Sequence, residues 1–266
     1  MRVLALPLAL VGTLSAALPA AATDKVPLAA RLDALVASYP GYIEGVEGNE
    51  LVLTGGKRHV IDDGKPRTHA EMLESGDIED MLSQVYPLGA CVSQEPPAND
   101  FEPGRVRNET FFKGLYGTSA AEVRRHLTSV EWFGEKLPVM RLQGVDAALA
   151  RVRADLAKLD PGLNRYLTPS AGTFNWRPIA GTGQLSAHSF GIAIDINTAF
   201  TDYWRWAGKR PAVAIAYKNR IPLEIVHVFE RHGFIWGGKW YHYDTMHFEY
   251  RPELIRIGEL AERAGC

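Results

Sequence analysis

The sequence predicts an α+β protein in which a small antiparallel sheet is flanked by helices. Residues 192–197 alternate between an apolar and a polar side, and residues 245–250 do the same. Period-two alternation indicates a strand with one face in the core. The apolar positions are Ile192, Ile194 and Ile196 in the first stretch and Met246, Phe248 and Tyr250 in the second. Apolar residues at helical spacing elsewhere predict the helices, and turn residues near the start predict a small β-meander.

The first 22 residues predict a secretory signal peptide. A basic Met1-Arg2 start precedes an apolar run over residues 3–18, and Ala20-Ala21-Ala22 supplies a small-residue cleavage pattern. The alternative is a membrane anchor, but the run is short for a span and ends at Pro19. We therefore expect an exported protein, periplasmic or secreted, whose mature part is soluble and has no membrane span.

Residues 23–104 form an N-terminal region to which the sequence assigns no role. Apolar residues at helical spacing predict a helix between Pro27 and Pro40, and another short helix near residues 78–85. Between residues 42 and 63, Gly- and Asp-containing turn pairs predict the β-meander. The stretch 92–104 is rich in proline and polar residues and predicts a linker.

Residues 105–266 form the second predicted domain. Ser119 and Glu122 form a capping box that predicts a helix with Val123 and Leu127 inside. Apolar residues on one helical face predict a long helix from residue 145 to 159, which stops at 160–162. A third helix is predicted between 222 and 233.

Composition limits the classes of function. The chain has 266 residues, of which 46% are hydrophobic and 23% charged, as in a soluble globular protein with an ample core. A formal net charge of -2 gives no electrostatic reason to expect nucleic-acid binding. We expect a monomer. The two cysteines, Cys91 and Cys266, can pair in an oxidising compartment; the alternative is two unpaired thiols.

His188, Asp195 and His247 are candidate metal ligands. Asp195 and His247 lie on the polar sides of the two predicted strands, and His188 stands seven residues before Asp195, with Gly191 between them to let the backbone bend. Three protein ligands and one open position form the arrangement of a catalytic zinc site. The alternative is a set of buried polar groups that satisfy one another. Other histidines are assigned surface or structural roles: His59, His69, His126, His227 and His232.

Two motifs in this order resemble those of the zinc peptidoglycan peptidases. The first is S-x-H-x-x-G-x-A-x-D over residues 186–195, and the second is D-x-x-H-F-E over residues 244–249. This family includes D-Ala-D-Ala carboxypeptidases of the VanY type and L-alanyl-D-glutamate endopeptidases. The resemblance covers about residues 105–266 and extends to residues 174–177 and 237–240.

The resemblance implies a role for each matching position. His188, Asp195 and His247 would bind Zn²⁺, Asp244 would be the general base, and Arg177 would bind the substrate carbonyl oxygen. The substrate would be the peptidoglycan stem peptide. An aspartate in the base position favours the L-Ala–D-Glu endopeptidase type slightly, with the D-Ala-D-Ala carboxypeptidase as the alternative. A carboxypeptidase needs a positive group for the terminal carboxylate, and the candidates are Arg177, Lys239 and Arg205.

Two residue roles have rivals. On a regular strand Asp244 would face away from His247, so it reaches the site only if the strand begins after it. Glu249 is the rival base, and its other interpretation is a hydrogen-bond partner of a ligand. Arg177 follows Trp176, and its alternative is a surface charge stacked on that ring.

Two other classes of function compete with the peptidase. Two histidines and a carboxylate also describe iron(II) oxygenases, but there the first histidine and the acid usually lie two residues apart, against seven here. A non-catalytic module of the same fold could bind cell wall or metal. Against it, every expected catalytic position holds a competent residue.

Overall fold

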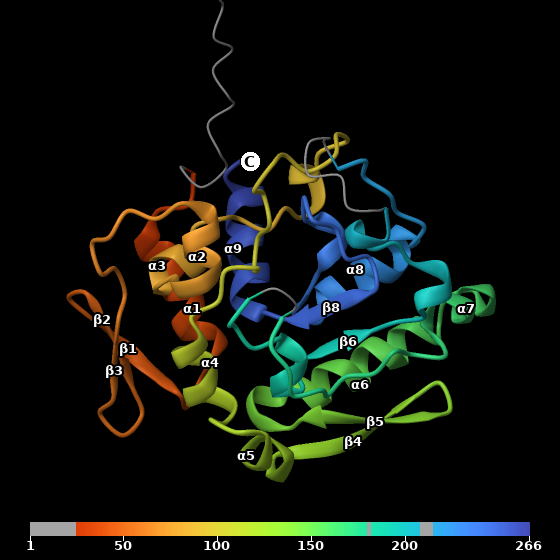
Figure 1. Ribbon diagram of the computed structural model, residues 1–266, viewed down its shortest axis with the longest axis horizontal. Coiled ribbons are helices and arrows are strands. Elements are labelled where there is room, and N and C mark those ends of the chain that lie inside the picture. The colour runs from red at the N-terminus through yellow and green to blue at the C-terminus, as the bar shows by residue number, and fades with distance from the viewer. Residues whose placement is uncertain (1–24, 180–181, 208–214) are drawn as a thin grey trace, which may run out of the picture.

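A computed structural model describes residues 25–179, 182–207 and 215–266 (Figure 1). The signal peptide predicted for residues 1–22 lies outside these ranges. Within them the α+β class is confirmed, because helices surround three small antiparallel sheets. Across the same ranges, every helix is too short or too polar to cross a bilayer.

The N-terminal region contains the predicted helix and meander. The three strands pair in sequence order, β1 with β2 and β2 with β3. The elements are α1 (Leu28–Ser38), β1 (Ile43–Glu47), β2 (Glu50–Leu53), β3 (Arg58–Val60), α2 (His69–Ser75) and α3 (Ile78–Met81). The short helix expected near residues 78–85 is therefore a single turn.

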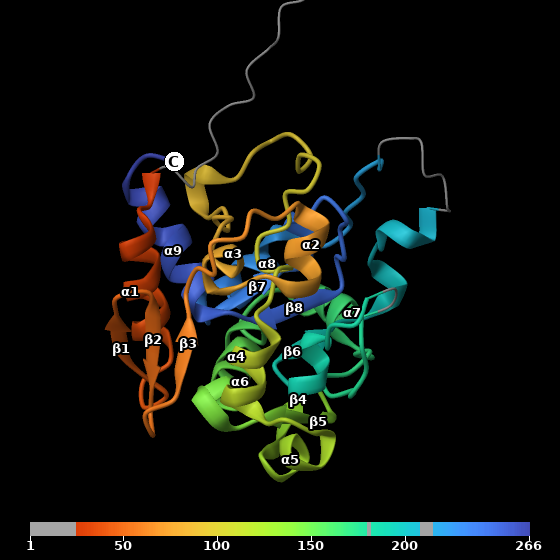
Figure 2. The same cartoon turned by 60° about the vertical axis from the view of Figure 1, so that its left-hand side comes forward.

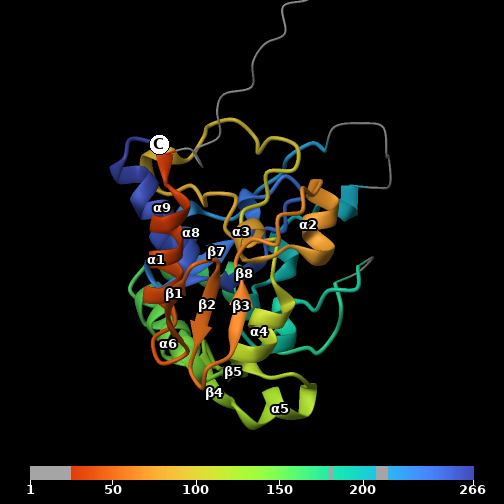
Figure 3. The same cartoon turned by 90° about the vertical axis from the view of Figure 1, so that its left-hand side faces the viewer.

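This region is packed against the rest of the chain. Helix α1 lies beside the C-terminal helix α9 (Pro252–Arg263) (Figures 1 and 3), and the Tyr39 hydroxyl donates to Glu253 Oε2 at 2.7 Å. The predicted disulfide between Cys91 and Cys266 is confirmed. One hydrophobic core runs from Val26 on the N-terminal side to the far end of α9. The division into two domains at residue 104 stays a prediction.

The middle of the chain differs from expectation at one point. Helix α5 (Ala120–Arg125) begins at the predicted Ser119 cap but ends early, so Leu127 opens strand β4 (Leu127–Trp132) instead of continuing the helix. Strand β4 pairs with β5 (Glu135–Met140) in register. The turn between them, Phe133-Gly134, has two positive φ angles, as a two-residue hairpin turn requires. This hairpin, which was not predicted from the sequence, sets the helix boundary.

The remaining elements surround a central sheet in the order β6-β8-β7, with β8 in the middle (Figure 2). Its strands are β6 (Ala193–Asp195), β7 (Phe234–Trp236) and β8 (His247–Tyr250), and the helices are α4 (Glu109–Tyr116), α6 (Val145–Leu156), α7 (Asn164–Leu167) and α8 (Leu223–Arg231). The two predicted strands are confirmed but shorter than expected. Strand β7 and helices α4, α7 and α9 were not predicted.

The central sheet has one apolar face and one polar face. On the apolar face Ile194 pairs with Phe248, and Phe229 of α8 stacks on Phe248 with ring centroids 3.8 Å apart. On the polar face Asp195 lies directly opposite His247. The side chains that could bind a metal ion or transfer a proton therefore lie on the face that α8 does not cover.

Candidate active site

His188 reaches the sheet through a tight turn. It lies on a 3₁₀ helix (Ala187–Phe190) capped by Ser186, and not on a strand. Gly191 ends this helix with φ of +66°, and a Cβ there would come within 2.7 Å of the Leu127 side chain. Only glycine fits such a conformation without strain. The predicted bend at Gly191 is thus confirmed, and it lets β6 run back under His188 toward Asp195.

The three predicted ligands converge. His188 Nε2 lies 3.1 Å from Asp195 Oδ1, His247 Nδ1 lies 3.0 Å from the same oxygen, and the two nitrogens are 3.2 Å apart. Ligands at about 2.1 Å from a tetrahedral zinc ion are about 3.4 Å apart. The donor triangle is therefore close to one face of a zinc tetrahedron, and these residues fit a metal ion.

Hydrogen bonds orient both imidazole rings. His188 Nδ1 lies 2.8 Å from the Thr173 carbonyl oxygen, which directs Nε2 into the site. His247 Nε2 lies 3.4 Å from Glu249 Oε2, which leaves Nδ1 for the site. Carbonyl or carboxylate partners of this kind fix the tautomer of metal-binding histidines.

The charges of these groups are strongly coupled. Burial alone would raise the pKa of Asp195, but the two histidines outweigh it and hold that pKa well below its usual range. Burial favours the neutral ring of His247, yet hydrogen bonds to Asp195 and Glu249 outweigh it and raise the pKa of His247 to about 9. The carboxylates of the site therefore favour a positive charge between them.

Asp244 lies at the edge of this site because β8 begins three residues after it. Its backbone is fixed by a bridge to Tyr203 and a hydrogen bond from its amide to the Gly237 carbonyl at 3.0 Å. A Cβ on Gly237 would come within 2.6 Å of the Asp244 carbonyl oxygen, so this approach needs glycine. The condition that the strand starts after Asp244 is met.

The Asp244 carboxylate has an unused acceptor. Its Oδ1 is buried and has no hydrogen-bond partner among the described residues. Burial and repulsion from Asp195 raise the pKa of Asp244 to about 6. A buried carboxylate oxygen without a partner is costly, and it is suited to a water molecule or a cation beside the ligands.

Glu249 is held differently. Its carboxylate is fully buried and is paired in two places with Arg107: Nε to Oε1 at 2.9 Å, and a short contact between Nη2 and Oε2. Arg251 Nη1 also lies 3.4 Å from Glu249 Oε1. These guanidinium groups outweigh burial and keep the pKa of Glu249 well below its usual range. Both carboxylate oxygens of Glu249 are therefore already used in contacts with arginine side chains.

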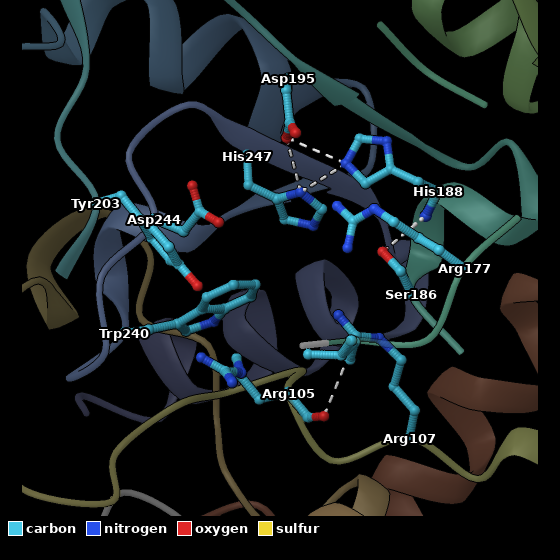
Figure 4. A pocket seen from close by; sticks show the side chains of 11 residues that line it. Arg105, Arg107, Arg177, Ser186, His188, Asp195, Tyr203, Trp240, Asp244 and His247 are labelled. Carbon is cyan, nitrogen blue, oxygen red and sulfur yellow. Dashed lines mark hydrogen bonds and ion pairs between the residues drawn. The ribbon is translucent and has the colours of Figure 1, made fainter. Parts of the chain in front are cut away.

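The ligands open into a pocket with three arginines (Figure 4). Arg177 lines it, and its guanidinium lies near His188 and Ser186. Arg105 and Arg107 were missed because they follow directly on the predicted linker. Among the described residues, the lining consists of Arg105, Arg107, Arg177, Ile179, Ser186, His188, Asp195, Tyr203, Trp240, Asp244 and His247.

Residues 180–250 match the family model described as D-alanyl-D-alanine carboxypeptidase. The resemblance to the zinc peptidoglycan peptidases is confirmed for this segment, which supports a peptidase and hence a hydrolase. It contains both motifs with His188, Asp195, Asp244 and His247, whereas the three pocket arginines lie outside it. No curated protein and no solved structure matches the chain.

Other residues singled out in the sequence lie elsewhere. Lys239 is buried, with its Nζ 2.5 Å from Glu230 Oε1, and it does not belong to the described lining of the pocket. Arg205 stacks over Trp204 and is likewise outside that lining. Both are therefore unsuited to receiving a substrate carboxylate in the pocket. His232 pairs with Asp155 at 2.8 Å, in keeping with its structural assignment.

Proposed function

We propose that the protein is an exported zinc metallopeptidase that hydrolyses an amide bond in the stem peptide of peptidoglycan. The observation that carries this proposal is the triangle of His188, Asp195 and His247 atoms, 3.0–3.2 Å on each side, next to a carboxylate with an unused oxygen. The family match over residues 180–250 supports the reaction and the class of substrate.

His188, Asp195 and His247 would hold the zinc ion. When bound, zinc lowers the pKa of a water ligand and polarises the scissile carbonyl. Asp244 would accept the proton of the attacking water as the C–O bond forms, and would then pass it to the leaving amine as the C–N bond breaks. The Arg177 guanidinium donates hydrogen bonds to the carbonyl oxygen as negative charge develops there.

The choice of Asp244 over Glu249 rests on their surroundings. Asp244 lines the pocket and has a buried oxygen without a partner among the described residues. Glu249 accepts from Arg107 at both oxygens and lies 3.4 Å from His247 Nε2. A base must be able to reach the proton that it abstracts. We therefore assign Asp244 as the base and Glu249 as the group that orients His247.

The bond that is cut has two candidates. Aspartate in the base position favours the L-Ala–D-Glu endopeptidase, as expected from the sequence. The pocket favours the D-Ala-D-Ala carboxypeptidase, because it contains a further cation, Arg105, and a carboxypeptidase needs a positive group for the terminal carboxylate.

Metal analysis and digestion of defined muropeptides test the proposal. We expect one zinc per chain and products that differ from the substrate by one hydrolysed amide, weighed by mass spectrometry. Zinc-loaded protein that leaves every stem peptide intact would be a binding module and not an enzyme. Activity that requires iron(II) and oxygen would identify the oxygenase class instead.

A further inference from the structure

We infer that Arg105 binds the C-terminal carboxylate of the peptide substrate and thereby makes the enzyme a carboxypeptidase. This inference rests on the proposed peptidase function. It concerns a residue outside the matched segment 180–250, directly after the stretch 92–104 that the sequence predicts as a linker.

The three arginines of the pocket are not equivalent. Arg107 is committed to Glu249 through two contacts, so its charge is already balanced. The Arg177 guanidinium has no hydrogen bond or ion pair with any residue in the described ranges, and it lies beside His188, where the scissile carbonyl would be (Figure 4). The remaining cation, Arg105, lies on the other side of the pocket next to Trp240.

Arg105 is held in place without using its hydrogen-bond donors. Its Nη1 lies 3.6 Å from Glu102 Oε1, which is an ion pair but longer than a hydrogen bond. Its guanidinium also lies over the Trp240 ring, 5.4 Å from the centroid. Within the described residues its side chain donates no hydrogen bond. A planar guanidinium with available donors matches a carboxylate in a bidentate arrangement.

Glu102 does not pair with Arg105 alone, because two histidines also contact its carboxylate. The fully buried Glu102 carboxylate contacts the His242 ring at 2.6 Å and the His69 ring at 3.1 Å, and it accepts from the His242 amide at 2.9 Å. Burial would raise the pKa of Glu102, but hydrogen bonds from both histidines hold it well below the usual range. Glu102 therefore fixes the position of Arg105 while leaving its donors for a ligand.

The segment that carries Arg105 is joined to the loop before Asp244. The Tyr241 amide donates to the Phe101 carbonyl at 2.9 Å, and the Trp240 indole donates to the Pro103 carbonyl at 2.8 Å. Arg105 is thus positioned in advance relative to the proposed base. Preorganised donors recognise a charged group at a lower entropic cost than mobile ones.

The two available cations imply a direction for the substrate. With the scissile carbonyl near Arg177, the residue after the scissile bond would extend toward Arg105. A free carboxylate there would form a charge-assisted pair, whereas the neutral amide of a continuing chain would leave Arg105 poorly matched. The pocket would therefore select the last residue of a peptide.

The experiment compares a synthetic stem pentapeptide ending in D-Ala-D-Ala with the same peptide carrying a C-terminal amide. For the zinc-loaded protein we expect kcat/KM to be higher for the acid. Arg105→Gln should lower kcat/KM for the acid by roughly 10- to 150-fold, the range of a hydrogen-bonded charge pair, and leave the amide nearly unchanged. Arg105→Lys should recover part of the loss.

Arg58→Gln is the matched control, because Arg58 is a half-exposed arginine of the meander, paired with Glu47 and Glu50. It should change neither substrate. An equal loss on both substrates in Arg105→Gln, or no preference for the acid in the unsubstituted protein, would overturn the inference.

Calorimetric binding of the D-Ala-D-Ala dipeptide to the zinc-loaded protein separates this inference from the proposed reaction. Dipeptide binding that depends on Arg105, in a protein that cuts neither pentapeptide, would refute the hydrolysis and keep the carboxylate site. Binding that is equal for the dipeptide and its amide would refute the carboxylate site, even if hydrolysis is observed.

Discussion

The two sides of the pocket have different origins. The proposed metal side, called the metal side below, consists of residues 186–195 and 244–247, all inside the segment that matches the carboxypeptidase family. The opposite side consists of the segment 101–107, which lies outside the match and brings Arg105 and Arg107. In our proposals the first side performs the chemistry together with Arg177, and Arg105 of the second side selects the substrate.

The difference follows from how each side is positioned. Asp195 and His247 face each other because the antiparallel register of β6 and β8 places them opposite, so spacing within two short motifs is enough to predict the pair. Arg107 meets Glu249 across 142 residues of sequence, through packing of a segment with no regular structure. Only a folded structure reveals such a contact.

The largest effect is expected from removing a metal ligand. His188→Ala or His247→Ala should abolish both bound zinc and activity, because each leaves two ligands where a catalytic site needs three. Circular dichroism would establish that the variants fold, and metal analysis would measure the zinc. A folded variant that keeps close to one zinc per chain would refute the assignment of that ligand.

The next effect separates the base from the ligands on the same side of the pocket. Asp244→Asn should retain zinc and lower kcat by roughly two to four orders of magnitude, the usual contribution of general-base catalysis. Glu249→Gln should lower kcat less, since it acts through His247. If Glu249→Gln were the more damaging of the two in the zinc-loaded protein, the base would be Glu249.

The sequence predicted that His188, Asp195 and His247 come together, with Asp244 beside them. Alternation within residues 192–197 and 245–250 identified the strands, and the motif spacing identified Asp244 despite its unfavourable position on an ideal strand. The hairpin of β4 and β5 was missed because the pattern of α5 was extended to Leu127. Arg105 and Arg107 were missed because proline and polar residues before them suggested a linker, whereas buried contacts of Glu102 and Pro103 hold that stretch in place.

A third prediction distinguishes the two arginines of the segment 101–107. Arg107→Gln leaves Glu249 with Arg251 at 3.4 Å as its remaining guanidinium, so the orientation of His247 is less well fixed. We expect zinc affinity to fall roughly 10- to 100-fold, as for other partners of metal-binding histidines. Competition with a chromogenic chelator measures this. Arg105→Gln is the control and should bind zinc normally; an equal loss in both variants would contradict the division of roles.

A fourth prediction concerns protons at the metal side. Because Asp195 and Glu249 raise the pKa of His247 to about 9, metal-free protein carries a proton there at pH 7. Zinc must displace it, so apparent affinity should rise about tenfold per pH unit until about pH 9. The stability of the metal-free fold changes with pH in the opposite direction. The contribution of His247 to the free energy of unfolding is complete below pH 6.5 and is lost as pH rises through about 9. Calorimetry in two buffers of different ionisation enthalpy would count the released protons, and a count of zero at pH 7 would contradict the prediction.

The smallest effect on catalysis is expected from the disulfide that precedes the segment 101–107. Replacing Cys91 and Cys266 by alanine opens a loop of 175 residues and should lower the free energy of unfolding by about 2–5 kcal/mol, as measured by urea denaturation. Activity at 25 °C and the preference for a free carboxylate should remain, because residues 101–103 are attached to residues 240–242 by their own hydrogen bonds. If the double variant kept its zinc and its activity on the amide but lost its preference for the acid, the disulfide would be what positions Arg105. The selective side of the pocket would then depend on oxidation, and the metal side would not.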